Sequence, residues 1–291
     1  MKLLSVKLQK QNYLKFIYET LVELPIANAS STDRFILQNL DGVSSEDVNV
    51  FMTNTNSQKG FYQGRRAENK EPVLLIGLNP DYGVDETVSG LRKYFYQMLL
   101  GPDPIRLVLR VETDTETLDL YTEGYIKRIE APMFSKEPQI QITMASLYPY
   151  IRHGYAVYKD NVGKNTFNVQ YEGTAPTGFR MYMVLNEAVT NLTIETPADY
   201  VRATTKFFKI NRAMVSGAYI DFSTEFGNRF VYYRSTPDGS LVNILDYVSS
   251  DSTWFGLEQE EQPFEIWAND HTFKPSIDFV TMTYSPKHWG I

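Results

Sequence analysis

Three histidines are the side chains of this sequence best suited to metal or acid–base chemistry. They are His153, His271 and His288, and no HExxH or equivalent spacing relates them. A zinc hydrolase needs two histidines one helical turn apart with a glutamate between them, so the spacing does not predict one. His153 follows a strand break and His288 lies in a Pro-Lys-His-Trp tail, and both are expected at the surface.

Two acidic clusters could also carry chemistry. The segment from Glu112 to Glu116 holds three carboxylates but lacks the twelve-residue Ca²⁺ loop and its closing glutamate, so a solvated hairpin tip is predicted. Glu258, Glu260 and Glu261 could include a glycosidase pair, but one flexible loop rarely holds the fixed separation that such catalysis needs. With no cysteine and no GxSxG elbow, the sequence predicts no enzyme, no cofactor and no metal site.

A glycine-flanked segment, Gly60 to Arg66, could suggest phosphate binding. A phosphate cradle needs glycines followed by a helix start and by lysine with serine or threonine, and these are absent. We therefore predict a bend that serves as a contact loop. Its candidate contacts with a partner are Phe61, Tyr62, Arg65 and Arg66.

Tryptophans could bind sugars by stacking. Trp254 and Trp267 are the candidates for carbohydrate stacking in the second half of the chain. The alternative is that both lie in alternating strands and pack against the sheet or core, as large indoles usually do. Both interpretations stay open at this point.

The composition is that of an acidic chain with ample core material. Of 291 residues, 43% are hydrophobic and 22% are charged, and the net charge is −7. Neither half resembles a basic nucleic-acid-binding surface. The absence of cysteine suits assembly in a reducing compartment. The opening MKLLSVKLQKQ is too short for a signal-peptide core, and no run could span a bilayer, so no membrane insertion is expected.

The first half mixes strands with one amphipathic helix. The segment from Asn12 to Leu24 fits either helix or strand. Residues 88–99 carry a helical apolar stripe that includes Tyr94, with Asp85 or Ser89 available as N-cap. Such a stripe indicates packing against a sheet.

A long hairpin then occupies residues 121–152. Its tip from Ala131 to Pro138 is a candidate inter-subunit contact through Met133, Phe134 and Lys136, and the alternative, an ordinary exposed hairpin, stays equally open. Pro149 cannot donate into a central ladder and marks the predicted end of the first domain.

The second half reads as an all-β unit. Eight short alternating runs separated by turn signals predict a two-sheet sandwich or jelly roll. We therefore expect a mainly β protein with one amphipathic helix. An α+β domain at residues 1–152 is followed by a β-sandwich domain at residues 153–291.

The order of these features resembles a known family. The first-half segments that carry the resemblance are Phe35-Ile36-Leu37, Leu40-Asp41-Gly42, Asp47-Val48-Asn49-Val50, Gly60-Phe61-Tyr62-Gln63-Gly64-Arg65, the strand from Val73 to Leu78, the helix bearing Arg92, and the hairpin ending in Ile142 and Pro149. Those of the second half are residues 168–176, 217–222, 231–233, Asp238-Gly239-Ser240 and Trp254-Phe255-Gly256-Leu257. Together they resemble the distal tail (Dit) proteins of long-tailed bacteriophages, with a galectin-like second domain. Residues 12–31 and 258–263 depart from that pattern.

The resemblance implies a structural function. Distal tail proteins form a homohexameric ring that joins the tail tube to the tail hub or baseplate and lets the genome pass without specific binding. The implied partners are further copies of the chain, the tail tube protein, the tail hub or tip protein, and receptor-binding proteins. The implied location is the distal end of the virion tail, after assembly in the bacterial host cytoplasm. The alternative function is a carbohydrate-binding β-sandwich that mediates adhesion to the host surface.

Overall fold

The computed structural model forms two compact units. The structure describes residues 2–12, 17–26, 33–43, 48–54, 60–114, 116–132, 138–154, 157–160, 163–198, 204–258 and 261–289. Unit 1 comprises Met1–Gly154 and His288–Ile291, and unit 2 comprises Tyr155–Lys287. The chain therefore returns to unit 1 after unit 2. Whether residues 1–152 and 153–291 act as separate functional domains stays a prediction.

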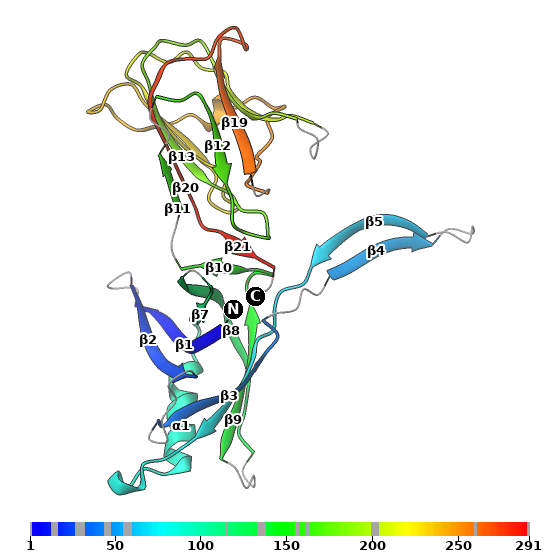
Figure 1. The fold of residues 1–291 in the computed structure, drawn as a ribbon, viewed down its shortest axis with the longest axis vertical. Coiled ribbons are helices and arrows are strands. Elements are labelled where there is room, and N and C mark those ends of the chain that lie inside the picture. The colour runs from blue at the N-terminus through cyan, green and yellow to red at the C-terminus, as the bar shows by residue number, and fades with distance from the viewer. Residues whose placement is uncertain are drawn as a thin grey trace. The chain divides into compact units, whose positions relative to one another are not determined.

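Unit 1 is built on one large antiparallel sheet (Figure 1). Along the sheet the strands follow the order β2 (Ile17–Pro25), β1 (Lys2–Asn12), β7 (Ile105–Glu112), β8 (Thr117–Glu130), β9 (Gln139–Ser146), β6 (Val73–Leu78) and β3 (Phe35–Asp41). The short β10 (Ile151–His153) pairs with β8 and with β21 (Lys287–His288). Segment 17–25 is thus a strand, which decides between the two interpretations of residues 12–24.

Strict alternation produces these strands. In β9, Ile140, Ile142 and Met144 are fully buried while the residues between them are partly exposed. A strand sends successive side chains to opposite faces, so this pattern buries one face of the sheet. The same alternation fixes the register, because a slip by one residue would move all three side chains to the other face.

The helix α1 (Val88–Leu99) packs on the buried side of this sheet. Leu91, Phe95 and Leu99 point into the core, as the predicted stripe requires. Two details of the prediction are wrong. The N-cap is Thr87, whose hydroxyl accepts from the Gly90 backbone N–H, and Tyr94 is 46% exposed. Thr87 has the extended backbone that an N-cap needs, whereas Asp85 is left-handed with φ 57°.

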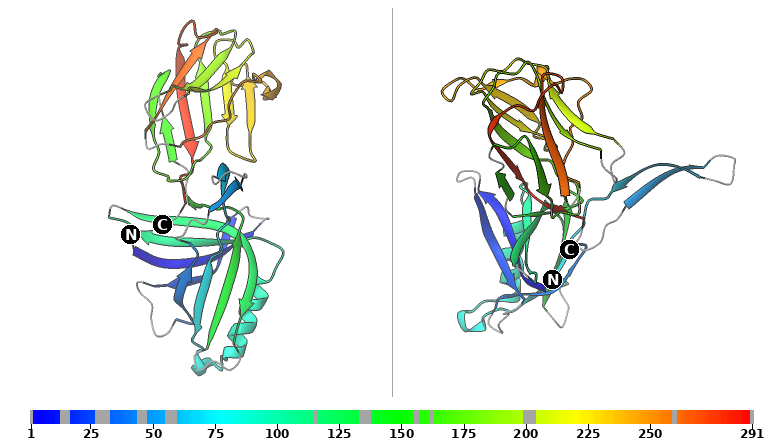
Figure 2. Two further views of the ribbon diagram at one scale, coloured as in Figure 1. Left: turned by 90° about the vertical axis from the view of Figure 1, so that its right-hand side faces the viewer. Right: turned by 45° about the horizontal axis from the view of Figure 1, so that its top comes forward.

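Two strands of unit 1 stand apart from its sheet. β4 (Val48–Asn54) and β5 (Gly60–Ala67) form a separate two-stranded ribbon, which Figure 2 shows in two further views. Seven residue pairs define its antiparallel register, with an irregularity between Phe51 and Met52. We call this ribbon the arm.

Unit 2 is a sandwich of two antiparallel sheets. One has the order β11 (Val157–Asp160), β20 (Ile277–Tyr284), β13 (Arg180–Leu185), β16 (Tyr219–Ser223), β17 (Phe230–Arg234) and β18 (Val242–Asn243). The other has the order β12 (Thr166–Gln170), β19 (Glu261–Ala268), β14 (Leu192–Thr196) and β15 (Lys206–Ile210). Alternate residues of both sheets, among them Phe222 and Phe264, fill a single core. Short 3₁₀ turns lie at Tyr82–Val84 (η1) in unit 1 and Leu245–Tyr247 (η2) in unit 2.

The predicted fold class is confirmed. In its described residues the chain is mainly β with one α-helix, and its second unit is a β-sandwich. The galectin-like label stays a prediction.

The sheet–helix core predicts a sharp contrast between two neighbouring aromatic residues. Phe95→Ala removes a fully buried ring and should cost unit 1 about 3–5 kcal/mol of unfolding free energy. Tyr96 belongs to the same helix and is 37% exposed. Tyr96→Ala should therefore change the unfolding free energy by about 0.5 kcal/mol or less. Urea unfolding of both variants tests this, and equal losses would contradict the packing.

Because unit 2 contains a hydrophobic core built from its own residues, a fragment of residues 155–287 should fold alone. Near-UV circular dichroism and a cooperative thermal transition would report this. A fragment ending at residue 154 should also fold, but with weaker protection of β8, because it lacks β21. An uncooperative transition of the 155–287 fragment would contradict the autonomy of unit 2.

Candidate assembly surfaces

The arm is the part of unit 1 that is least stabilised by pairing with other strands of the chain. Among the described strands, β4 and β5 pair only with each other. An isolated two-stranded hairpin is at best marginally stable in water, because it cannot bury an apolar face on its own. An arm of this kind is therefore suited to contact with another chain.

Four predicted contact residues lie on the arm. Phe61, Tyr62, Arg65 and Arg66 all belong to β5, so the predicted bend is a strand instead. The backbone register places Phe61 opposite Thr53 and Arg65 opposite Val50. The roles of these four residues in assembly stay predictions.

The second predicted contact is the tip of the β8–β9 hairpin. Met133, Phe134 and Lys136 lie outside the described residues. The base of the tip is anchored on both sides. Arg92 of α1 donates from Nη2 to the Pro132 carbonyl at 2.7 Å, and the Leu78 N–H donates to the Pro138 carbonyl at 2.8 Å.

A shallow hollow lies beside this anchored base. Its volume is about 360 Å³, and its lining is Leu75, Glu130, Ala131, Pro132, Gln139 and Gln141. The hollow adjoins the predicted contact tip. It lies within unit 1 and has a mixed polar and apolar lining.

Exposed apolar side chains gather on α1 and the turn before it. Tyr82 is 73% exposed, Val84 63% and Leu100 58%. The turn that presents Tyr82 is fixed by Asp81, whose carboxylate accepts from the Gly83 N–H at 2.9 Å. Sequence periodicity assigned Tyr94 to the core and gave no signal for the turn. Turn chemistry, an Asp followed by Tyr-Gly-Val-Asp, is the signal that could have found it.

Two histidines, the buried His153 and the partly exposed His288, meet where β10 pairs with β21. His153 is only 3% exposed, and its Nε2 lies 2.8 Å from Nε2 of His288, with the two rings stacked at 5.0 Å. The prediction that His153 lies at the surface is therefore wrong, whereas His288 is partly exposed. The reason is that His288 belongs to the returning chain, which the sequence order of the two residues does not reveal. The pKa of His153 is lowered to about 4, mainly by burial and secondly by the charge of the neighbouring His288.

Two carboxylates of the second acidic cluster have separate partners in unit 2. Glu258 pairs with Lys206 at 2.6 Å, and Glu261 accepts from Asn168 Nδ2 at 2.6 Å. Glu260 lies outside the described residues. Within the residues that the structure describes, no group of three or more potential ligands could hold a metal ion. In the same residues no helix is long and apolar enough to cross a membrane.

Trp267 projects from β19 on the face of the four-stranded sheet that points away from the core. Its indole N–H donates to Glu265 at 3.0 Å, and the Lys274 ammonium lies 4.6 Å from the ring centroid. His271 lies against the same ring, with centroids 5.5 Å apart. The faces and the donor of this indole therefore already have partners within the chain.

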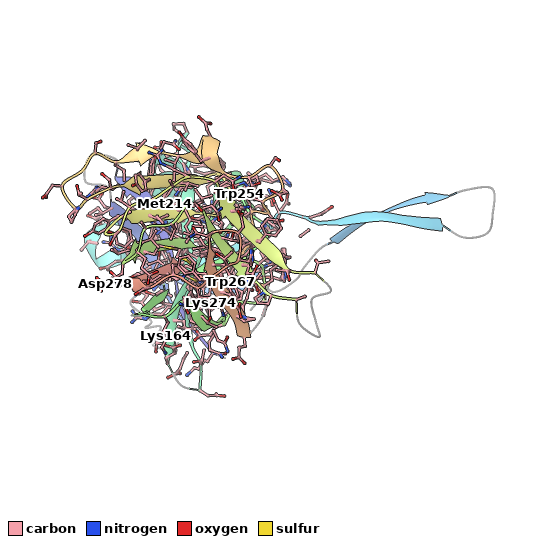
Figure 3. All side chains as sticks on the ribbon, turned by 90° about the horizontal axis from the view of Figure 1, so that it is seen from above. Lys164, Met214, Trp254, Trp267, Lys274 and Asp278 are labelled. Atoms are coloured by element: carbon pink, nitrogen blue, oxygen red, sulfur yellow. The ribbon has the colours of Figure 1, made fainter. Side chains whose placement is uncertain are left out.

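Trp254 lies in an irregular segment after η2, so the prediction that it belongs to a strand is wrong (Figure 3). Its ring packs on Phe208 at 4.7 Å between centroids, and the Arg229 guanidinium lies 5.3 Å away. Trp254 thus covers one end of the sandwich core. Both indole rings therefore have neighbours within the chain, and their use in sugar binding stays a prediction.

Comparison with known proteins identifies the fold. No protein-family model and no curated protein sequence matches the chain. Among solved structures, the Dit protein of phage SPP1, described as a paradigm of the hub adsorption apparatus in phages that infect Gram-positive bacteria, aligns with a TM-score of 0.66. It is 14% identical, and the alignment covers 97% of this chain and 98% of that one. A structure of the phage P2 baseplate aligns at a TM-score of 0.47 with 9% identity. The resemblance drawn from the sequence is confirmed at the level of the fold.

The histidine pair predicts acid sensitivity in unit 1. The pKa of His153 falls from 6.5 to about 4 on folding, so the unfolded chain binds more protons between these values. Above pH 6.5 the shifted pKa should leave the unfolding free energy of unit 1 undiminished. As the pH drops towards 4, this free energy should fall by up to about 3 kcal/mol. Hydrogen exchange of Leu120 and Tyr121, which pair with β10, would report the loss.

His153→Gln should flatten this pH dependence. His271→Gln is the matched control, because His271 is exposed and pairs with Glu195 in unit 2. An unchanged pH slope in His153→Gln would show that His153 is not responsible.

Proposed function

We propose that this chain is a structural protein of the phage tail tip. In this proposal, six copies form a ring at the distal end of the tail tube, join the tube to the hub or baseplate, and let the genome pass. The observation that carries the proposal is the alignment of nearly the whole chain, in both units, with the SPP1 Dit protein. A likeness confined to one common β-sandwich would not reach a TM-score of 0.66 over 97% of the chain.

The arm supports assembly into a ring. A closed ring of identical subunits uses a head-to-tail contact, in which two different surfaces of each subunit meet. A projecting ribbon that lacks a sheet of its own supplies one such surface, and it gains stability when a neighbour covers it. The exposed aliphatic and aromatic side chains on and before α1 offer a second surface of different shape.

The acidic composition suits a conduit for DNA. With a net charge of −7, the chain as a whole repels phosphates. A lumen that neutralised phosphates would hold the genome back, because each neutralised phosphate releases counterions and adds affinity. The proposed passage of the genome therefore involves no specific binding.

The proposed partners follow from this position. The tail tube protein would contact one side of the ring, and the tail hub or tip protein the other. Receptor-binding proteins would attach around it. The proposed location is the virion tail, after assembly in the bacterial host cytoplasm, and the proposed function is not enzymatic.

An image of the virion tests the proposal directly. Cryo-electron microscopy of tails carrying a tagged chain should place six copies between the tube and the hub. A tail-tip reconstruction without density for unit 1 would contradict the proposal. A monomer in dilute solution would not, since the tail tube can act as a template for the ring.

Removal of the arm should separate folding from assembly. Replacing residues 48–67 with a short Gly-Ser linker should leave the nine-stranded sheet of unit 1 folded, because no described strand of that sheet pairs with the arm. The variant should fail to enter tails in a complementation assay. The control is Phe226→Ala, which changes a side chain of unit 2 that is 85% exposed. This variant should still be incorporated into tails. Normal incorporation of the armless variant would rule out the arm as an essential contact.

A further inference from the structure

A row of four side chains crosses the outer face of the six-stranded sheet in unit 2. The register places Arg180 of β13 opposite Thr283 of β20 on one side and Ser223 of β16 on the other. Ser223 in turn lies opposite Phe230 of β17. Their strand neighbours Met181, Phe222, Val231 and Met282 belong to the core. Alternation therefore directs the four side chains away from the core, side by side.

Neighbouring segments surround this row, so that the row forms the floor of a cavity of about 260 Å³. One wall is the tip of the β16–β17 hairpin, where Glu225 and Asn228 line the cavity and the Asn228 N–H donates to the Glu225 carbonyl at 3.0 Å. Another wall is the segment before β13. A Cβ on Gly178 would lie 2.4 Å from the Glu225 Cα, so the two walls can meet only because this residue is glycine.

The cationic group of the floor is held rigidly. Arg180 donates from Nε to one oxygen of Asp221 at 2.8 Å and from Nη2 to the other at 2.5 Å. This bidentate contact fixes the guanidinium plane and leaves the Nη1 hydrogens outside the pair. The centroid of the Phe230 ring lies 5.6 Å from the guanidinium carbon, and the ring stacks on Tyr232 with 4.9 Å between centroids, so Phe230 adds a partly covered apolar surface to the same floor.

The charge of the cavity disfavours anionic ligands. Asp221 offsets the charge of Arg180, and Glu225 adds a carboxylate to the lining. The remaining lining offers hydroxyl groups from Ser223, Thr283 and Ser285 and the amide of Asn228. Phosphate or carboxylate ligands would meet an acidic wall, whereas a neutral ligand rich in hydroxyls would find donors, acceptors and one aromatic face.

We propose that this cavity binds one pyranose unit of a neutral glycan. Its volume lies just below the range of about 300–1,000 Å³ typical of drug-sized ligands, which suits a single ring. The fixed Arg180 and the Glu225 carboxylate would bond to neighbouring hydroxyls, and the part of the Phe230 ring left uncovered by Tyr232 would contact the C–H groups of the sugar. The site is distinct from Trp254 and Trp267, and it is independent of the proposed ring function.

Ligand-observed NMR on the full-length chain tests the proposal. The probes are methyl glycosides of glucose, galactose, mannose and rhamnose and free N-acetylglucosamine, each titrated to ~10 mM, with inorganic phosphate alongside, because single-ring ligands bind at millimolar Kd. At least one neutral sugar should bind saturably, and phosphate should not. No saturable binding by any sugar, or binding of phosphate in their place, would overturn the proposal.

Variants locate the site. Glu225→Gln and Asn228→Ala keep the backbone turn and should weaken binding about tenfold each, the loss expected for a hydrogen bond to a charged or well-placed polar group. Phe230→Ala should weaken it at least as much. Trp267→Ala, on the other sheet, is the matched control and should keep the wild-type Kd within about twofold. Thermal unfolding would confirm that each variant is folded. Loss of binding in Trp267→Ala with retention in Glu225→Gln would overturn the assignment.

Discussion

A two-stranded β-ribbon cannot bury both of its faces, and this constraint separates the arm from every other strand of the chain. The remaining strands of unit 1 belong to one sheet, of which one side packs on α1. The strands of unit 2 face each other across a shared core. The arm has neither a third strand nor a helix among the described elements. In the proposed assembly, a neighbouring copy would supply the covering surface that the described elements do not.

The fold class follows from the sequence because alternation is a local property. Residues 139–146 and 180–185 show it without any knowledge of their neighbours, and the stripe of α1 is equally local. The same reasoning fails where a competing local signal is present. Thr87 caps α1 in place of Asp85 because capping depends on backbone conformation, which residue type alone does not define. Tyr94 fits the apolar stripe by spacing, yet it lies at the edge of the buried sector and stacks on Phe35 at the surface.

The candidate surfaces are less predictable, because they depend on register between distant strands. His153 and His288 are 135 residues apart, and their contact requires the pairing of β10 with β21. The cavity floor combines residues from four strands, of which only β16 and β17 are consecutive in the chain. By contrast, the tryptophans attracted a sugar-binding hypothesis by residue type, and their rings turn out to be engaged by Lys274 and Arg229. Residue type identifies groups that can stack, but only the fold shows which of them have room to do so.

The return of the chain to unit 1 has a consequence for biosynthesis. β21 is the last strand in the sequence, so the pairing of β10 with it has to wait until all of unit 2 has left the ribosome. At ordinary elongation rates this delay is on the order of ten seconds, long compared with the folding of a small domain. During that interval the first 154 residues exist without their final strand, and His153 has no stacked neighbour from β21. Completion of unit 1 therefore has to wait until β21 is available, after the strands of unit 2 have been synthesised.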